Sequence, residues 1–273
     1  MRNTAPQRAA LLLVAALMTG PAAAEDIGRE LRRGESAEGN YLELGLGLRA
    51  ANGPKRHGLD ADPLGLAAII NGCFQWKGVF IENHAEDAHG LVLGYGLVEQ
   101  PDWSLDLLLT SKHQRTRHEG AAWRVLDTQA DRVAGLRLSG TAGAAVWQFN
   151  AWKDVSGRHD GFGASAQLGR AWQHGNWNLH ALAGLNYSSA KVLDYYHGVS
   201  AQQSAVTGLA AYRAGAGWGG AAEVGASYPL ARDWVLRSTL RAIRNPSTVR
   251  DSSRWSDPKR TATSLLLSVS HVF

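Results

Sequence analysis

The chain has 273 residues, a formal charge of +4, 19% charged residues and one cysteine. This charge is too small to indicate a nucleic-acid partner, and Cys73 alone cannot form an internal disulfide. No Pro/Ser-rich or single-charge tract divides the sequence, so we expect one domain behind an N-terminal leader.

Residues 1–24 have the features of a cleaved secretory signal. Arg2 and Arg8 supply its positive region, residues 9–18 its apolar stretch, and residues 22–24 a small-residue cleavage site. The alternative, a membrane anchor, needs about 20 apolar residues. Cleavage would lower the formal charge from +4 to +2 and leave residues 25–39 as a short, solvated periplasmic tail.

Alternation with a period of two residues dominates residues 40–273. In "YLELGLGL" the leucines point to one face and Glu43 and the glycines to the other, as in a strand with one apolar face. We expect twelve strands, or ten if "GLAAIINGCFQWKGVF" forms none; its turn is expected at Gly72. The expected strands are 40–49, 64–71, 74–82, 89–98, 103–110, 131–139, 143–152, 161–170, 176–187, 217–228, 234–243 and 263–273.

Short and long connections alternate between these strands. Outer-membrane barrels sort their connections in this way, with short periplasmic turns and long outer loops. Since unpaired backbone groups cannot remain in hydrocarbon, a sheet there must close on itself. The pattern therefore predicts an all-β, transmembrane, antiparallel up-and-down barrel in the outer membrane.

Tryptophan recurs just after the short turns, at Trp103, Trp177 and Trp234, and Tyr228 precedes the last of these turns. Such side chains settle at the headgroup level and form an aromatic girdle. The alternative is a soluble barrel with core tryptophans, but a soluble core has no need to place them at one rim.

With the apolar face outward, the polar face becomes the lumen. If the last short hairpin is tightly paired, Glu223 faces Thr239, and Arg237 and Arg241 are its diagonal neighbours. We expect an ion-pair cluster there that plugs the barrel. The expected lumenal set is Glu43, Gln75, Lys77, Asp106, Arg137, Gln148, Asn150, Gln167, His180, Glu223, Arg237 and Arg241.

The last strand, "TSLLLSVSHVF", alternates and ends in Phe273. This resembles the recognition signal of outer-membrane barrels, except that His271 replaces the usual apolar or aromatic residue. It predicts that the barrel-assembly machinery contacts the chain through this strand.

Catalytic chemistry finds little support in the pattern. "HGVS" places His197 and Ser200 three residues apart in a loop without a third orienting group, and we expect no enzyme activity, no cofactor and no metal.

The outer loops at 112–124 and 244–260 are basic, which fits either lipopolysaccharide phosphates or ordinary solvated charge. The outer histidines are expected to be solvated, because no pair has zinc-type spacing: His57, His84, His89, His113, His118, His159 and His197.

The most individual segment runs from 194 to 242. It carries a Tyr-Tyr-x-Gly-Val-Ser motif followed by Ala-Tyr-x-Ala-Gly-Ala-Gly, and in both respects it resembles the MipA/OmpV family of outer-membrane proteins. We expect this segment to be an ordered loop over the barrel mouth, with a mobile loop as the alternative. Its motif residues are Tyr195, Tyr196, Gly198, Val199, Ser200, Ala211, Tyr212, Ala214, Gly215, Ala216 and Gly217.

The resemblance implies a function as well as a location. The name-giving member of the family is described as a scaffold that links the murein-degrading transglycosylase MltA to a penicillin-binding murein synthase. Other members are described as porin-like proteins or adhesins. We therefore expect a structural scaffold that contacts a lytic transglycosylase and a penicillin-binding protein through its periplasmic turns and the 25–39 tail, and that also contacts lipid and lipopolysaccharide. A small-solute pore and a loop-based adhesin are the alternatives.

Overall fold

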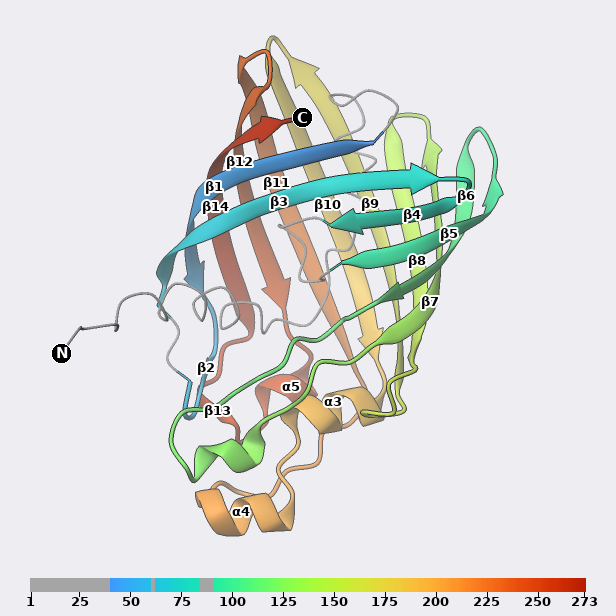
Figure 1. Cartoon of the computed structure of the whole chain (residues 1–273). Coiled ribbons are helices and arrows are strands. Elements are labelled where there is room, and N and C mark those ends of the chain that lie inside the picture. Colours follow the sequence, from blue (N-terminus) through green and yellow to red (C-terminus); the bar gives the residue numbers. More distant parts are fainter. Residues whose placement is uncertain (1–39, 60–61, 84–90) are drawn as a thin grey trace, which may run out of the picture.

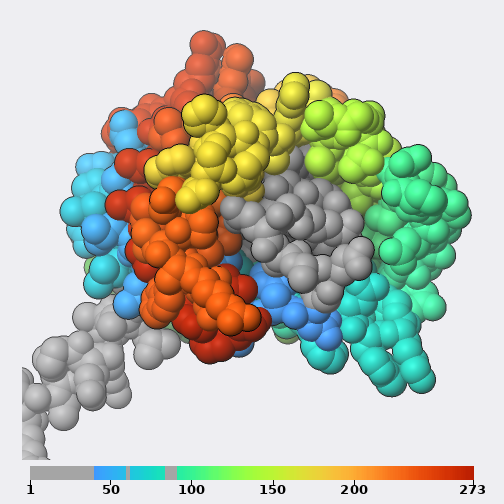
Figure 2. Space-filling model, turned by 90° about the horizontal axis from the view of Figure 1, so that it is seen from above, coloured from blue at the N-terminus to red at the C-terminus, as the bar shows by residue number. Residues whose placement is uncertain are grey.

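The computed structural model describes residues 40–59, 62–83 and 91–273, and its main feature is a closed antiparallel β-barrel (Figure 1). Twelve strands pair with their neighbours in chain order, and β1 pairs with both β3 and β14 to close the ring. Seen from above, the colours accordingly follow the chain around the molecule (Figure 2). The predicted up-and-down barrel is confirmed. The expected leader and tail, residues 1–39, lie outside the described residues.

The barrel strands have these bounds: β1 Tyr41–Asn52, β3 Leu64–Trp76, β4 Val79–Asn83, β5 Val92–Glu99, β6 Trp103–Thr110, β7 Val133–Ala142, β8 Ala145–Asp154, β9 Phe162–His174, β10 Trp177–Ser188, β11 Gly217–Ala231, β12 Trp234–Arg244 and β14 Thr261–Val272. The other described elements are the short strands β2 (Lys55–Arg56) and β13 (Trp255–Asp257), the 3-10 helix η1 (Trp123–Leu126), and the helices α3 (Ala190–His197), α4 (Ala201–Thr207) and α5 (Ser247–Arg250). Among these described helices, none has the length and apolar composition needed to cross a bilayer.

The barrel exposes its apolar side chains and buries its polar ones. Leu46 and Leu66 on the outer face are 71% and 72% exposed, whereas Glu43 and Asn71 on the inner face are 3% and 1% exposed. In water this arrangement would be unfavourable, because large contiguous apolar surfaces drive association. In a bilayer it is the expected arrangement for a barrel strand, with apolar residues outward and polar residues inward.

The two ends of the barrel differ. At one end, which we call the short-turn end, the strands are joined by turns of two or three residues at 77–78, 100–102, 143–144, 175–176 and 232–233. At the other end the connections are longer, and they carry all the described helices together with β2 and β13, which lie at the bottom of Figure 1.

The hairpin β3–β4 differs from the prediction. Gly72, where we expected the turn, lies inside β3, and the chain turns instead at Lys77 (φ 48°) and Gly78 (φ 83°). Positive φ at both central residues matches the two-residue turn whose twist suits a hairpin. Lys77 therefore lies in the turn, and its predicted lumenal position is wrong. Because a shift of one residue exchanges the faces of a strand, Glu82 points inward instead.

Candidate functional site

The aromatic residues expected at the rim lie at the short-turn end. Trp103, Trp177 and Trp234 are the first residues of their strands and are 39%, 41% and 45% exposed. The ring of Tyr228 lies 4.9 Å from that of Trp177. A position at the barrel rim is compatible with the headgroup-level girdle, which stays a prediction.

Several other aromatic residues lie at the two rims without a recurrent sequence pattern that marks them. Trp76, 63% exposed, directly precedes the turn at Lys77 at the same rim. At the opposite end, the ring of Tyr187 lies 6.0 Å from Phe162 and 5.2 Å from Trp218. These residues stand at strand ends without a short-turn pattern before them, so only the register of the barrel brings them together.

The lumen contains three groups of charged side chains. In the first, Arg137 binds two carboxylates: its Nη1 lies 2.5 Å from Glu82 Oε1 and its Nε 3.0 Å from Asp106 Oδ2. All three residues are at most 7% exposed. Asp106 directly faces Arg137 across the β6–β7 pair, whereas Glu82 comes from β4 and was missed because the β3–β4 turn was misplaced.

The second lumenal group lies where the first and last strands close the barrel, and it links β1 to β12 across β14. Arg237 on β12 donates two hydrogen bonds to the carboxylate of Glu43 on β1, at 3.0 and 3.2 Å. The side chains of Asn71 and Ser270 also donate to Glu43. Such a fork-shaped contact between Arg and a carboxylate is among the stronger charge-assisted arrangements.

The third lumenal group is Glu223 with Arg241 and His180. Arg241 Nε lies 2.6 Å from Glu223 Oε2, and His180 Nε2 lies 3.1 Å from Glu223 Oε1. The predicted pairing of Glu223 with Thr239 is wrong, because β11 continues to Ala231 and the chain turns only at 232–233. With this turn and a bulge between Pro229 and Ala231, Arg241 lies opposite Glu223.

This register divides the cluster that the sequence predicted. Arg237 faces Ser227 instead of neighbouring Glu223 and binds Glu43 across the adjoining strands. The expected lumenal glutamines and asparagine lie on the inner face, since Gln148, Asn150 and Gln167 are at most 6% exposed. Gln75 is exposed and lies at the short-turn end.

The variant Glu223→Ala tests the third group. It leaves Arg241 and His180 inside the barrel without their carboxylate, and removing one partner of a buried pair costs about 3–5 kcal/mol. We expect the lower end of this range, because the Arg241 side chain keeps 11% exposure and can hydrate. Urea unfolding of the chain reconstituted in lipid measures the lost free energy of unfolding. An unchanged midpoint and slope would show that this group does not stabilise the barrel.

The long connections form a packed layer that we call the loop cap, defined by its described residues 53–59, 111–132, 155–161, 189–216 and 245–260. Its small core contains Leu193, Ala214, Val249 and Trp255, all at most 7% exposed. The strands β2 and β13 pair within it, with Trp255 opposite Arg56. Segments distant in sequence thus hold one another over this end of the barrel.

The family motif residues lie inside the loop cap, as expected for an ordered loop. Tyr195 Oη accepts a hydrogen bond from Gln129 N and Tyr196 Oη donates one to Gln129 O, both at 3.2 Å. Val199 and Tyr212 exchange backbone hydrogen bonds of 2.7 and 2.8 Å. The two halves of the motif are therefore paired with each other and with the 111–132 connection.

Two further motif residues have structural roles. Ser200 caps helix α4, accepting a hydrogen bond from Gln203 N while the Gln203 side chain accepts from Ser200 N. Gly198 has φ −70°, and a Cβ on it would lie 2.5 Å from Asp194 O. Glycine is needed at this position for close approach, not for a left-handed turn.

Two buried arginines lie at the centre of the cap. Arg254, 2% exposed, donates to the carbonyl oxygens of Gly198 and Leu126, each at 2.8 Å. Arg56 stacks 4.7 Å above the Trp255 ring, and its Nη2 lies 3.5 Å from His197 Nδ1. Burial, together with the charge of Arg254, lowers the pKa of Arg56 to about 9, so both remain cationic at neutral pH.

The buried His197 makes closure of the cap depend on pH. Burial first, and then the charges of Arg56, Arg254 and His113, hold the pKa of His197 well below its usual range. An opened cap takes up a proton at His197 as the pH falls below about 6.5, whereas the closed cap does not. Below a pH of about 6.5, the closed cap therefore becomes less stable relative to the opened cap by about 1.4 kcal/mol for each pH unit.

Hydrogen exchange of the 195–203 amides tests this pH dependence. After correction for the intrinsic rate, we expect about tenfold weaker protection at pH 5.5 than at pH 7.5. The variant His197→Gln should lose most of this difference. The buried His118, whose pKa is also lowered, first by burial, accounts for a remaining slope. Equal protection at both pH values would contradict this account.

The predicted solvation of the outer histidines is wrong for several of them. His118, His159 and His197 are 4%, 8% and 5% exposed, and the His113 side chain is 13% exposed. His84 and His89 lie outside the described residues. The "HGVS" residues do not form a nucleophile–base pair: Ser200 Oγ caps α4, and His197 Nδ1 lies beside Arg56.

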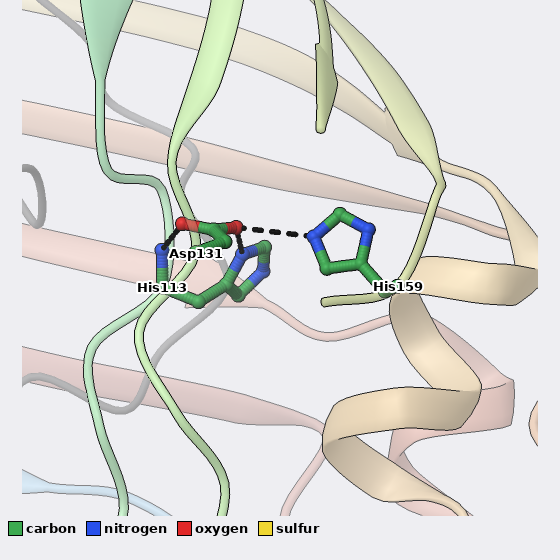
Figure 3. Close-up of side chains that lie close together, drawn as sticks. All are labelled: His113, Asp131 and His159. Carbon is green, nitrogen blue, oxygen red and sulfur yellow. Dashed lines mark hydrogen bonds and ion pairs between the residues drawn. The ribbon is translucent and has the colours of Figure 1, made fainter. Parts of the chain in front are cut away.

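One group among the described residues brings three metal-ligating side chains together: His113, Asp131 and His159 (Figure 3). Burial alone would raise the pKa of Asp131, but hydrogen bonds from both histidines outweigh it and hold that pKa well below its usual range. The three residues come from two different connections, so no sequence spacing could reveal them.

The short-turn end has a cavity of about 110 Å³. Its lining includes Glu99, Asp102 and Trp103 together with the buried Asp106 and Arg137 of the first lumenal group. Glu99 and Asp102 are exposed. This end of the barrel therefore presents turns and an acidic recess, in contrast to the covered long-loop end.

Comparison with known proteins agrees with this architecture. The model of the family described as "MltA-interacting protein MipA" matches residues 46–273. The MltA-interacting protein of Escherichia coli (strain K12) is 36% identical over 69 residues, 25% of this chain and 28% of that relative. The putative outer membrane protein YiaT of the same organism is 25% identical over 165 residues, 55% of this chain and 67% of that protein.

Solved outer-membrane barrels align with most of the chain. The NanC porin aligns with a TM-score of 0.47 and 10% identity, over 84% of this chain and 98% of the porin. Outer membrane phospholipase A from Escherichia coli aligns with a TM-score of 0.44 and 13% identity, over 95% of this chain and 96% of that chain. The region matched in the MltA-interacting relatives covers little more than a quarter of their length (28%). The family match, however, extends from the first barrel strand to Phe273, and this outer-membrane barrel therefore belongs to the family of MltA-interacting protein MipA.

Proposed function

We propose that the chain is a non-conducting scaffold that binds a murein-degrading transglycosylase of the MltA kind at its short-turn end. The name of the family and of its Escherichia coli member supports this class of partner. A penicillin-binding murein synthase, lipopolysaccharide at the exposed arginines of the cap, and the barrel-assembly machinery at Phe273 belong to the same proposal. No catalytic role is part of it.

The observation that carries the proposal is the contrast between the two ends of the barrel. The loop cap packs through buried contacts at one end, and paired charges such as Arg137 with Glu82 lie in the lumen. In outer-membrane barrels the short turns face the periplasm. The end that faces the cell wall is then the one with exposed turns and the acidic recess at Glu99 and Asp102.

A small-solute pore is the second candidate. The inner face is mostly polar, and among the described residues neither amide atom of Gln167 nor the hydroxyl of Ser268 has a hydrogen-bond partner. Buried polar groups of this kind are usually satisfied by water, so the lumen is expected to be hydrated between its charged groups. Hydration alone does not provide a continuous path through the barrel. Adhesion through the cap is a third candidate, for which the exposed Arg115 and Arg117 offer a surface.

Binding of a purified MltA-type transglycosylase to the chain in lipid nanodiscs tests the proposal. The double variant Glu99→Lys/Asp102→Lys changes the short-turn end and leaves the lumenal pairs intact. We expect it to weaken binding at least tenfold, because reversed charge at a complementary surface slows association and adds repulsion. The matched control is Asp251→Lys on the exposed surface of the loop cap.

Two results would overturn this proposal. One is an absence of binding by the unmodified chain. The other is binding that is lost with Asp251→Lys but kept with the short-turn variant, since the partner would then contact the loop cap.

A further inference from the structure

The group formed by His113, Asp131 and His159 has the composition and the geometry of a metal site. Asp131 Oδ2 lies 2.8 Å from His113 Nδ1 and 3.3 Å from His159 Nε2. All three ligand atoms lie within 4.8 Å of one another. In Figure 3 the carboxylate stands between the two rings, which approach it from different connections.

The group is buried and held in place. The side chains of Asp131 and His159 are fully buried. The other carboxylate oxygen, Asp131 Oδ1, accepts hydrogen bonds from the backbone N–H groups of Lys112 and His113 at 2.8 and 3.0 Å. This fixes the carboxylate with Oδ2 directed at the rings. The His113 ring stacks on Tyr196 at 4.2 Å, which fixes its plane.

We propose that His113 Nδ1, His159 Nε2 and Asp131 Oδ2 bind one divalent transition-metal ion of the Zn²⁺ type. Two imidazoles and one carboxylate favour such ions over Ca²⁺ or Mg²⁺, which prefer all-oxygen sites. Ligand bonds of about 2.0–2.2 Å in a tetrahedral shell place ligand atoms about 3.4 Å apart. The carboxylate oxygen lies 2.8 and 3.3 Å from the two ring nitrogens, and those nitrogens lie within 4.8 Å of each other. Side-chain rotations that bring all three atoms to about 3.4 Å would complete the site.

Metal binding requires the proton of each ring to move to its other nitrogen. Without metal, His159 Nδ1 accepts from Gly161 N at 3.0 Å, so the ring proton is on Nε2 and points at Asp131. With metal, Nε2 would supply its lone pair to the ion and the proton would move to Nδ1, which breaks the hydrogen bond from Gly161 N. Asp154 Oδ2 lies 3.7 Å from Nδ1 and can accept that proton after a small rotation.

Asp154 is therefore a positioning residue. A carboxylate that accepts the distal N–H of a ligating histidine is a recurrent feature of such sites, and losing it typically weakens metal binding about 10–100-fold. The bound ion would join the 111–132 and 155–161 connections and so tighten the loop cap. This inference does not depend on the proposed partner at the short-turn end.

Metal titration of the full mature chain, without a polyhistidine tag, tests the site. The chain is stripped with EDTA in detergent and titrated with ZnCl₂ against a chromogenic chelator. We expect one ion per chain and no competition from Ca²⁺. His159→Gln and His113→Gln should weaken Zn²⁺ binding more than about a hundredfold, because losing a ligand costs more affinity than losing a residue that only hydrogen-bonds a ligand. Asp154→Asn should weaken binding about tenfold. The control is His174→Gln, exposed at the end of β9.

CoCl₂ gives a second readout that does not rely on the variants folding equally well. Co²⁺ bound in place of Zn²⁺ should give visible absorption bands of a four- or five-coordinate site with nitrogen and oxygen ligands. Far-UV circular dichroism checks that each variant forms the barrel. The proposal is overturned if the unmodified chain binds no stoichiometric Zn²⁺ and gives no such bands. Equal affinity in the His159 and His113 variants would overturn it as well.

Discussion

Replacing Arg137 by methionine is expected to cost about 3–5 kcal/mol of barrel stability. The change leaves the carboxylates of Glu82 and Asp106 inside the lumen without the cation that they share. The Glu82 side chain has no exposed surface and that of Asp106 is 10% exposed, so water cannot fully replace the lost contacts. Guanidinium unfolding of the chain refolded into lipid vesicles measures the difference.

Two controls separate the charge effect from a packing defect. The triple variant Arg137→Met/Glu82→Gln/Asp106→Asn removes all three charges, and we expect it to recover much of the loss, because neutral groups are cheaper to bury than unpaired ions. Arg170→Met, on an exposed position of β9, should stay within about 0.5 kcal/mol of the original chain. A single Arg137→Met variant as stable as the original would refute the first lumenal group.

The variant Arg254→Ala is expected to open the loop cap while the barrel remains folded. Its guanidinium joins Gly198 O and Leu126 O, and its own carbonyl oxygen accepts from His57 N. Losing two hydrogen bonds from a charged donor costs about 3 kcal/mol. Hydrogen exchange in segments 123–128 and 195–203 should therefore accelerate about a hundredfold, with unchanged exchange in the barrel strands.

Arg254→Lys provides the graded comparison. Lysine keeps the charge but lacks the planar fork that reaches both carbonyl oxygens, so we expect an intermediate acceleration. If Arg254→Ala leaves exchange in both segments unchanged, the cap is held by other contacts, and the central role given to Arg254 is wrong.

The barrel could be predicted from the sequence because lipid enforces a simple rule. Each strand must present apolar residues outward at every second position, and the alternation of Leu42, Leu44, Leu46 and Leu48 records that rule directly. Local turn chemistry was less readable. Lys77–Gly78 adopts positive φ at both positions without the usual Asn-Gly signature, whereas Gly72 lies within a strand, where a Cβ would be 3.1 Å from Tyr41 O.

The lumenal residues could be assigned to a face but not to partners. The pairing of Glu223 with Arg241 depends on an irregularity at Pro229 that alternation does not encode. The pairing of Glu43 with Arg237 depends on closure of the barrel between β1 and β14, which brings together residues 194 positions apart. Partners of this kind follow from register and closure, which only the folded barrel fixes.

The contacts within the loop cap could not be predicted from the sequence. The motif at Tyr195–Ser200 identified an ordered segment, but its partners come from connections without any periodic pattern. Several histidines that we expected to be solvated are buried, because these connections pack on one another. The group of His113, Asp131 and His159 exists only in that packing.

Single-channel recording across planar lipid bilayers tests the central claim most directly. If the loop cap closes the barrel and the lumenal ion pairs fill it, as we propose, the purified chain shows no steady conductance at neutral pH. Arg254→Ala, which opens only the cap, should stay silent or flicker briefly, because the lumenal groups remain. A stable ohmic conductance from the unmodified chain would contradict the closed scaffold and favour a pore.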